Sequence, residues 1–141
     1  VVEEIVDAGE KYDYGLEAGS KPELLAVLAY NTNANSLTIL NGYKDEDYLS
    51  LALLGTQLGR KIVIVIEKFS ELNKVIALSK KYNVTPLIGL RGKMSNLGTG
   101  RWAKSTGDRA KFGLSISEMI RAVKLLEENG MKDSIKLFDR A

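Results

Sequence analysis

Four short polar segments carry residue types that could do chemistry, and each directly follows an apolar stretch of the chain. They begin at Glu17, Asn41, Glu67 and Arg91. Carboxylates, an amide and a guanidinium in this arrangement suit acid–base work or the holding of a cofactor. Polar strand ends that simply reach solvent, with Ser20 acting only as a helix N-cap, explain the same pattern, so position alone leaves both interpretations open.

The residue types that are missing narrow the chemistry further. The 141 residues contain no His and no Cys, and they carry 20 Lys plus Arg against 18 Asp plus Glu. These absences exclude a Ser–His–Asp triad, a thiolate zinc site and the usual general base near neutral pH within these residues. Any chemistry here therefore uses carboxylates, Lys, Arg, Tyr, hydroxyls or a cofactor, and we expect no metal ligands.

Charge and hydropathy point away from nucleic acid and membrane. A net charge of +2 is too small to indicate a polyanion partner by itself. The longest apolar run, 62–66, has the length of a strand and is far below the roughly 20 residues that cross a bilayer. The acidic start does not resemble a secretory signal. We expect a globular, cytoplasmic protein that binds neither nucleic acid nor membrane.

One long polar loop, 92–114, needs separate weighing. Gly98–Ser105 nearly matches a phosphate-binding P-loop, but Ala103 replaces the second glycine and turn residues follow where a helix should begin. The loop also combines basic residues with Trp102, as single-stranded nucleic-acid sites do. One aromatic residue in a nearly neutral chain is thin support, so an active-site or interface loop is the better prediction.

The elements that would position these residues alternate between strand and helix. Hydrophobic spacing and capping signals, among them Ser20 with Glu23, predict the boundaries. The expected helices are 1–9, 21–30, 45–58, 70–82 and 117–129, and the expected strands are 11–18, 37–40, 61–67, 86–91 and one starting at 134.

This alternation, with a period of about 25 residues, predicts βα units around a parallel sheet. Two architectures use such units, an open doubly wound sheet and a (β/α)8 barrel. About four units are present, whereas a barrel needs eight. We therefore expect residues 1–141 to be a single partial domain, an internal fragment of a longer chain.

Several blocks in order along the chain resemble the biosynthetic arginine decarboxylases of bacteria and plants. Lys111–Leu114 also resembles the related ornithine and diaminopimelate decarboxylases, while the Glu17 block and the Trp102 loop indicate the arginine branch. The blocks are Tyr14–Val27, Asn41–Asp45, Val65–Glu71, Gly89–Arg91, Gly100–Ser105 and Lys111–Leu114.

The resemblance implies part of a pyridoxal-phosphate enzyme with an alanine-racemase-like (β/α)8 barrel. Such an enzyme converts L-arginine to agmatine and CO2 for putrescine and spermidine synthesis, works as a homodimer or larger homo-oligomer, and can also use Mg²⁺. By the same resemblance, Glu17 lies near the cofactor and Arg91 on the cofactor-facing side of its strand. Weaker cofactor-binding candidates are Ser20, Asn41, Lys44, Glu67 and Lys111.

Two departures from this family matter. Its Schiff-base lysine belongs to a segment that would precede residue 1, and its ring-stacking histidine belongs to a strand that here reads Leu137–Ala141. No residue here is therefore assigned a catalytic role, and the isolated chain is expected to be inactive. The alternative is a non-catalytic half-barrel module that binds an anionic or phosphorylated small molecule.

Overall fold

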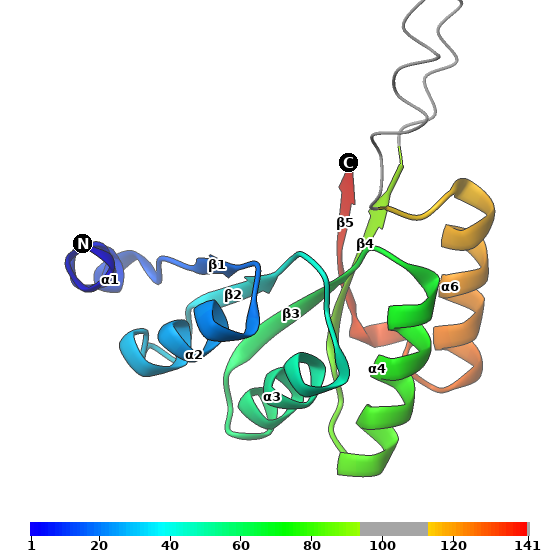
Figure 1. Ribbon diagram of the computed structural model, residues 1–141, viewed down its shortest axis with the longest axis horizontal. Coiled ribbons are helices and arrows are strands. Elements are labelled where there is room, and N and C mark those ends of the chain that lie inside the picture. The colour runs from blue at the N-terminus through cyan, green and yellow to red at the C-terminus, as the bar shows by residue number, and fades with distance from the viewer. Residues whose placement is uncertain (94–112, 141) are drawn as a thin grey trace, which may run out of the picture.

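Five parallel strands form one sheet whose strand order is the chain order (Figure 1). The computed structural model describes residues 1–93 and 113–140. A doubly wound sheet reverses its strand order part-way, whereas a barrel adds each strand beside the previous one. The observed order is that of a barrel. The strands are β1 (Leu16–Ala18), β2 (Leu37–Leu40), β3 (Lys61–Ile66), β4 (Leu87–Gly92) and β5 (Ile135–Arg140).

Four helices lie along one side of this curved sheet (Figure 1). Each follows a strand, which makes four βα units, and a further helix, α1, precedes β1. α2 contacts β1, α3 and α4 contact β3, and α6 contacts β4. The helices are α1 (Val2–Gly9), α2 (Lys21–Tyr30), α3 (Glu46–Gln57), α4 (Phe69–Tyr82) and α6 (Ile116–Glu128), with short 3-10 turns η1 (Glu10–Tyr12) and η2 (Lys132–Ser134).

The core lies between the sheet and these helices. Alternate strand residues such as Leu40, Ile64 and Leu90 are fully buried there. Side chains of the opposite parity point to the other face of the sheet, where they line an apolar hollow of about 500 Å³. The residues around that hollow are Leu37, Ile39, Lys61, Val63, Leu87, Lys136 and Leu137.

The predicted boundaries agree with the structure to within two residues, with one exception. The strand predicted over 11–18 is wrong in its first half, because η1 occupies Glu10–Tyr12 and β1 begins only at Leu16. Asp13 has a left-handed backbone with φ of 53°, which breaks any extended run through it. The aromatic residues around it, which favoured a strand, are exposed instead.

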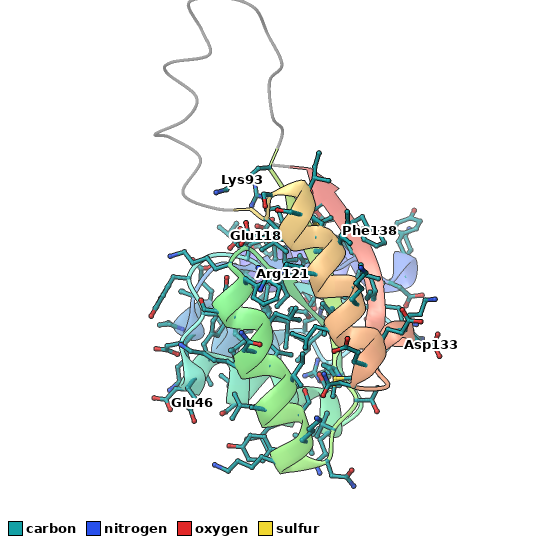
Figure 2. All side chains as sticks on the ribbon, turned by 90° about the vertical axis from the view of Figure 1, so that its right-hand side faces the viewer. Glu46, Lys93, Glu118, Arg121, Asp133 and Phe138 are labelled. Carbon is teal, nitrogen blue, oxygen red and sulfur yellow. The ribbon has the colours of Figure 1, made fainter. Side chains whose placement is uncertain are left out.

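The start of α6 is anchored beside the end of β4. Ser115 Oγ accepts from the Glu118 N–H (3.2 Å), and Glu118 Oε1 accepts from the Ser115 N–H (3.0 Å), which together form a capping box. The second of these bonds lowers the pKa of Glu118, with help from Lys93 nearby (Figure 2). The Leu114 N–H donates to the Arg91 carbonyl (2.7 Å), which ties this helix start to the strand end.

Candidate functional site

The polar residues predicted at the strand ends meet in two pairs at the carboxyl edge of the sheet. Asn41 Nδ2, just after β2, donates to Glu17 Oε1 on β1 at 2.7 Å. Arg91 Nη1, on β4, donates to Glu67 Oε1, just after β3, at 2.8 Å. The parallel register brings the carboxyl ends of all four strands to one edge of the sheet. Along the strands these polar residues alternate in step with Ile39 and Val63, so they belong to the same, open face of the sheet. We call this group the mouth.

Behind the second pair lies a buried ionic cluster centred on Lys44. Its Nζ is 3.3 Å from Glu67 Oε2, 3.1 Å from Glu71 Oε2 and 2.7 Å from the Gly42 carbonyl oxygen. Lys44 is completely buried and Glu67 is 2% exposed. Buried charges persist where each has partners of opposite sign. The cluster therefore runs Glu71, Lys44, Glu67, Arg91, with alternating charge.

The pKa of Glu71 is subject to opposing influences within this cluster. Burial raises the pKa of Glu71, and the negative charge of Glu67 adds to the rise, while the Lys44 ammonium opposes both. The other oxygen, Glu71 Oε1, accepts from the backbone N–H of Glu67 at 3.3 Å. The side chain thus reaches back from the first turn of α4 and holds the end of β3 in place.

A tight turn between β2 and α3 puts Lys44 into this position. Gly42 has φ of +82°, and a Cβ there would lie 2.4 Å from the carbonyl oxygen of Gly19, so only glycine fits. The Ala18 carbonyl accepts from the Asn41 N–H and from the Tyr48 hydroxyl, both at 3.0 Å. Burial raises the pKa of Tyr48. The end of β1 and the start of α3 therefore clamp the turn from two sides.

Two buried polar atoms at the mouth lack hydrogen-bond partners in the part of the chain that the structure describes. They are the acceptor Asn41 Oδ1 and the donor Arg91 Nε. The carboxylate of Asp139 on β5 lies 3.7 Å from Arg91 Nε, close enough for charge attraction but too far for a hydrogen bond. An unmet donor and an unmet acceptor on one edge suit a polar ligand that offers both.

The structure sorts the predicted site residues into three groups. Glu17, Asn41, Glu67 and Arg91 meet at the mouth, and Lys44 stands behind them. Ser20 Oγ accepts from the Glu23 N–H at 3.4 Å, so its visible role is that of an N-cap. Lys111, Trp102 and the segment Gly98–Ser105 lie outside the described residues.

Sequence reasoning missed two members of the site. Glu71 looked only like a helix-start residue, although its position four residues after Glu67 puts it within reach of the strand end. Asp139 looked like the start of a divergent end, yet β5 pairs with β4 in a register that sets it opposite Arg91. The four-residue spacing from Glu67 could have revealed Glu71 in the sequence. The position of Asp139 depends on the register between β4 and β5, which the sequence does not give.

Comparison with known protein families decides what this sheet belongs to. Residues 1–138 match the family described as "Pyridoxal-dependent decarboxylase, pyridoxal binding domain". The chain belongs to this family. Its relatives by sequence include biosynthetic arginine decarboxylases from Bacteroides thetaiotaomicron, 50% identical, and Geobacter sp. strain M21, 47% identical, each over 137 residues. These alignments cover 97% of the chain but only 22% of each relative.

Solved structures agree with the family assignment. The biosynthetic arginine decarboxylase of Campylobacter jejuni superposes with a TM-score of 0.83 at 35% identity, over 99% of this chain and 22% of its own. A diaminopimelate decarboxylase from M. jannaschii shares the fold alone, with a TM-score of 0.68 at 17% identity, over 98% of this chain and 31% of its own. The prediction of a partial (β/α)8 barrel of pyridoxal-phosphate decarboxylases is confirmed.

Clusters of metal-ligating side chains or long apolar helices would indicate other classes of site in residues 1–93 and 113–140. Within these ranges no three His, Cys, Asp or Glu side chains gather in a way that could hold a metal ion, so Mg²⁺ has no visible site there. No helix in the same ranges is long and apolar enough to cross a membrane.

Proposed function

We propose that the chain forms part of the cofactor-binding barrel, residues 1–141 making up one partial domain, of an enzyme that decarboxylates L-arginine to agmatine and CO2. The observation that carries the proposal is the 50% identity, over 137 residues, to a biosynthetic arginine decarboxylase. Because the chain spans 22% of that relative, the activity is assigned to a longer enzyme. Its product would feed polyamine synthesis. We propose a cytoplasmic enzyme, and a homo-oligomer as the family resemblance implies.

The mouth residues fit pyridoxal phosphate as the cofactor. Its oxyanion groups need cations and N–H donors, which Arg91 offers, and its polar substituents need acceptors such as Asn41 Oδ1. When bound, the cofactor supplies an electron sink for the pair of electrons that the departing carboxylate leaves behind. We assign Glu17, Asn41 and Arg91 to the cofactor-facing edge, and Ser20 and Lys111 remain weaker candidates.

In this proposal the chain's own residues bind and orient. Glu17, exposed and held by Asn41 Nδ2, presents its carboxyl group at the mouth, where it can accept a hydrogen bond from a cationic group. Lys44 and Glu67 are buried and stand behind Arg91, so they act through it. The chain alone is expected to release no CO2, because no His and no assignable Schiff-base lysine lies within it.

A chimera tests the proposal directly. The 137 aligned residues of this chain replace the matching residues of the Bacteroides thetaiotaomicron arginine decarboxylase, and release of labelled CO2 from L-arginine, L-ornithine and diaminopimelate is measured. We expect release from arginine and background from the other two. The unaltered enzyme is the positive control, and the isolated chain with added cofactor is the negative one. A folded chimera that binds cofactor yet prefers another amino acid would refute the proposal.

A further inference from the structure

The ion pair between Glu67 and Arg91 is one-sided. Glu67 uses only Oε1 on Arg91, through Nη1 at 2.8 Å, because Oε2 is occupied by the Lys44 ammonium at 3.3 Å. A carboxylate and a guanidinium left to themselves often form two parallel hydrogen bonds. Beside Nη1, the second bond would use Arg91 Nη2, which forms a fork with Nε on the other side of the planar guanidinium. Arg91 Nε has no hydrogen-bond partner in the described part of the chain.

The geometry points to Lys44 and Glu67 as positioning residues that keep the Glu67 carboxylate on Arg91 Nη1 alone, so that the side of the guanidinium that carries Nε stays available for an oxyanion at the mouth. The Lys44 ammonium is held in place by the Gly42 carbonyl oxygen (2.7 Å) and by Glu71 (3.1 Å). Because Lys44 is fixed, it sets the rotation of the Glu67 carboxylate. Glu67 then holds the guanidinium at one end. This inference rests on the proposed function, in which Arg91 faces the cofactor.

The arrangement also controls charge at the mouth. Lys44 neutralises one of the two buried carboxylates behind Arg91. Glu67 therefore offsets only part of the positive charge of Arg91, and the rest can attract an anion. The Asp139 carboxylate, at 3.7 Å from Nε and 43% exposed, lies beside the same donor. A phosphate or a carboxylate group would satisfy the same donor.

A neutral double variant tests this positioning. Lys44→Met with Glu71→Gln removes one charge of each sign, leaves the net charge unchanged and frees Glu67 Oε2 to pair with Arg91 a second time. Inorganic phosphate is titrated into the chain while the side-chain N–H signals of ¹⁵N-labelled arginine are followed by NMR. Arg91→Lys identifies the Arg91 signal, and Arg60, which donates to backbone carbonyls, is the internal reference.

We expect phosphate to shift the Arg91 Nε signal but not that of Arg60, and the double variant to bind phosphate about tenfold more weakly. The matched control, Lys132→Met with Glu127→Gln, makes the same two changes in an exposed pair and should bind like the unsubstituted chain. Unchanged or tighter binding by a folded double variant overturns the inference. If that variant does not fold, an Arg91 signal that phosphate leaves unmoved in the unsubstituted chain overturns it equally.

Two further comparisons complete the test. One distinguishes a carboxylate from a phosphate as the anion, and the other distinguishes failure of the positioning inference from failure of the proposed function. A parallel titration with acetate shows whether a carboxylate or a phosphate is preferred, and either preference supports the inference. The titrations need no turnover, so a chimera without arginine decarboxylation would refute the proposed function while leaving the positioning of Arg91 to be judged on the NMR result alone.

Discussion

The two ends of the sheet around β3 both use a buried or half-buried cation, but they satisfy it differently. At the carboxyl end, Lys44 is surrounded by the carboxylates of Glu67 and Glu71. At the amino end, Arg60 donates to the backbone carbonyls of Leu28 (2.8 Å) and Asn31, where α2 ends. One cation is held by ions and the other by neutral dipoles.

This difference separates the edge that we propose to be functional from an edge with a structural role. The carbonyls at the end of α2 need donors whatever the protein does, and Arg60 supplies them as a helix C-terminal cation does. Buried carboxylates, by contrast, cost desolvation energy that apolar packing would avoid. Barrels of this kind concentrate chemistry at the carboxyl ends of their strands and stability at the other end. Lys44 and Arg60 follow that division.

Lys44→Met should have the largest effect on stability, because it leaves two buried carboxylates without their shared cation. We expect the free energy of unfolding to fall by about 3–5 kcal/mol, measured by urea denaturation. Lys74→Met, on the exposed face of α4, is the matched control and should change it little. A loss no larger than that of the control would show that Lys44 does not stabilise the two buried carboxylates.

Much of this comparison was accessible from the amino-acid pattern. The β-branched run before Glu67 predicted β3, and the strand-end rule placed Glu67 and Arg91 on one edge. The burial of Lys44 was not predictable, because it depends on the turn at Gly42 passing against β1, a contact between distant segments. The pairing of Asp139 with Arg91 needed the β4–β5 register, which includes an irregularity between Ile88 and Gly89.

Gly42→Ala should come next, since it disturbs the turn that carries Lys44. We expect a loss of about 3 kcal/mol, from the left-handed backbone and from the clash with the Gly19 carbonyl together. Gly59→Ala is the matched control, with φ of +92° but open space around its Cβ position, and should lose only about 1 kcal/mol. Equal losses in the two variants would mean that close packing at the mouth contributes nothing.

Arg60→Met should cost about 2 kcal/mol, less than Lys44→Met, because the groups it abandons are neutral. Urea denaturation gives the loss, and phosphate titration should find the affinity of the mouth unchanged. A drop in phosphate affinity would contradict the division between the two ends. A drop in phosphate affinity without any loss of stability would mean that Arg60 serves the mouth and not the fold.

Glu71→Gln should change the pH dependence of stability rather than its size at low pH. Because the pKa of Glu71 is raised above its ordinary value of 4.5, the folded state retains a proton that the unfolded state loses. Its contribution is complete below pH 4.5 and is lost as pH rises through the folded-state pKa. The free energy of unfolding of the unsubstituted chain should therefore fall relative to that of the variant over this window, which urea denaturation at several pH values measures. Parallel curves would contradict the raised pKa.

The sequential order of the strands has a consequence for how the molecule assembles. Along β1 to β4, residues paired in register are only 22 to 24 positions apart, as in Leu16 with Thr38 and Thr38 with Ile62. Ile88 and Ile135, between β4 and β5, are 47 apart, and closing a chain segment twice as long costs about 0.6 kcal/mol more in entropy. The sheet can therefore grow unit by unit as the ribosome releases it. β5, with Asp139, is the strand expected to join last.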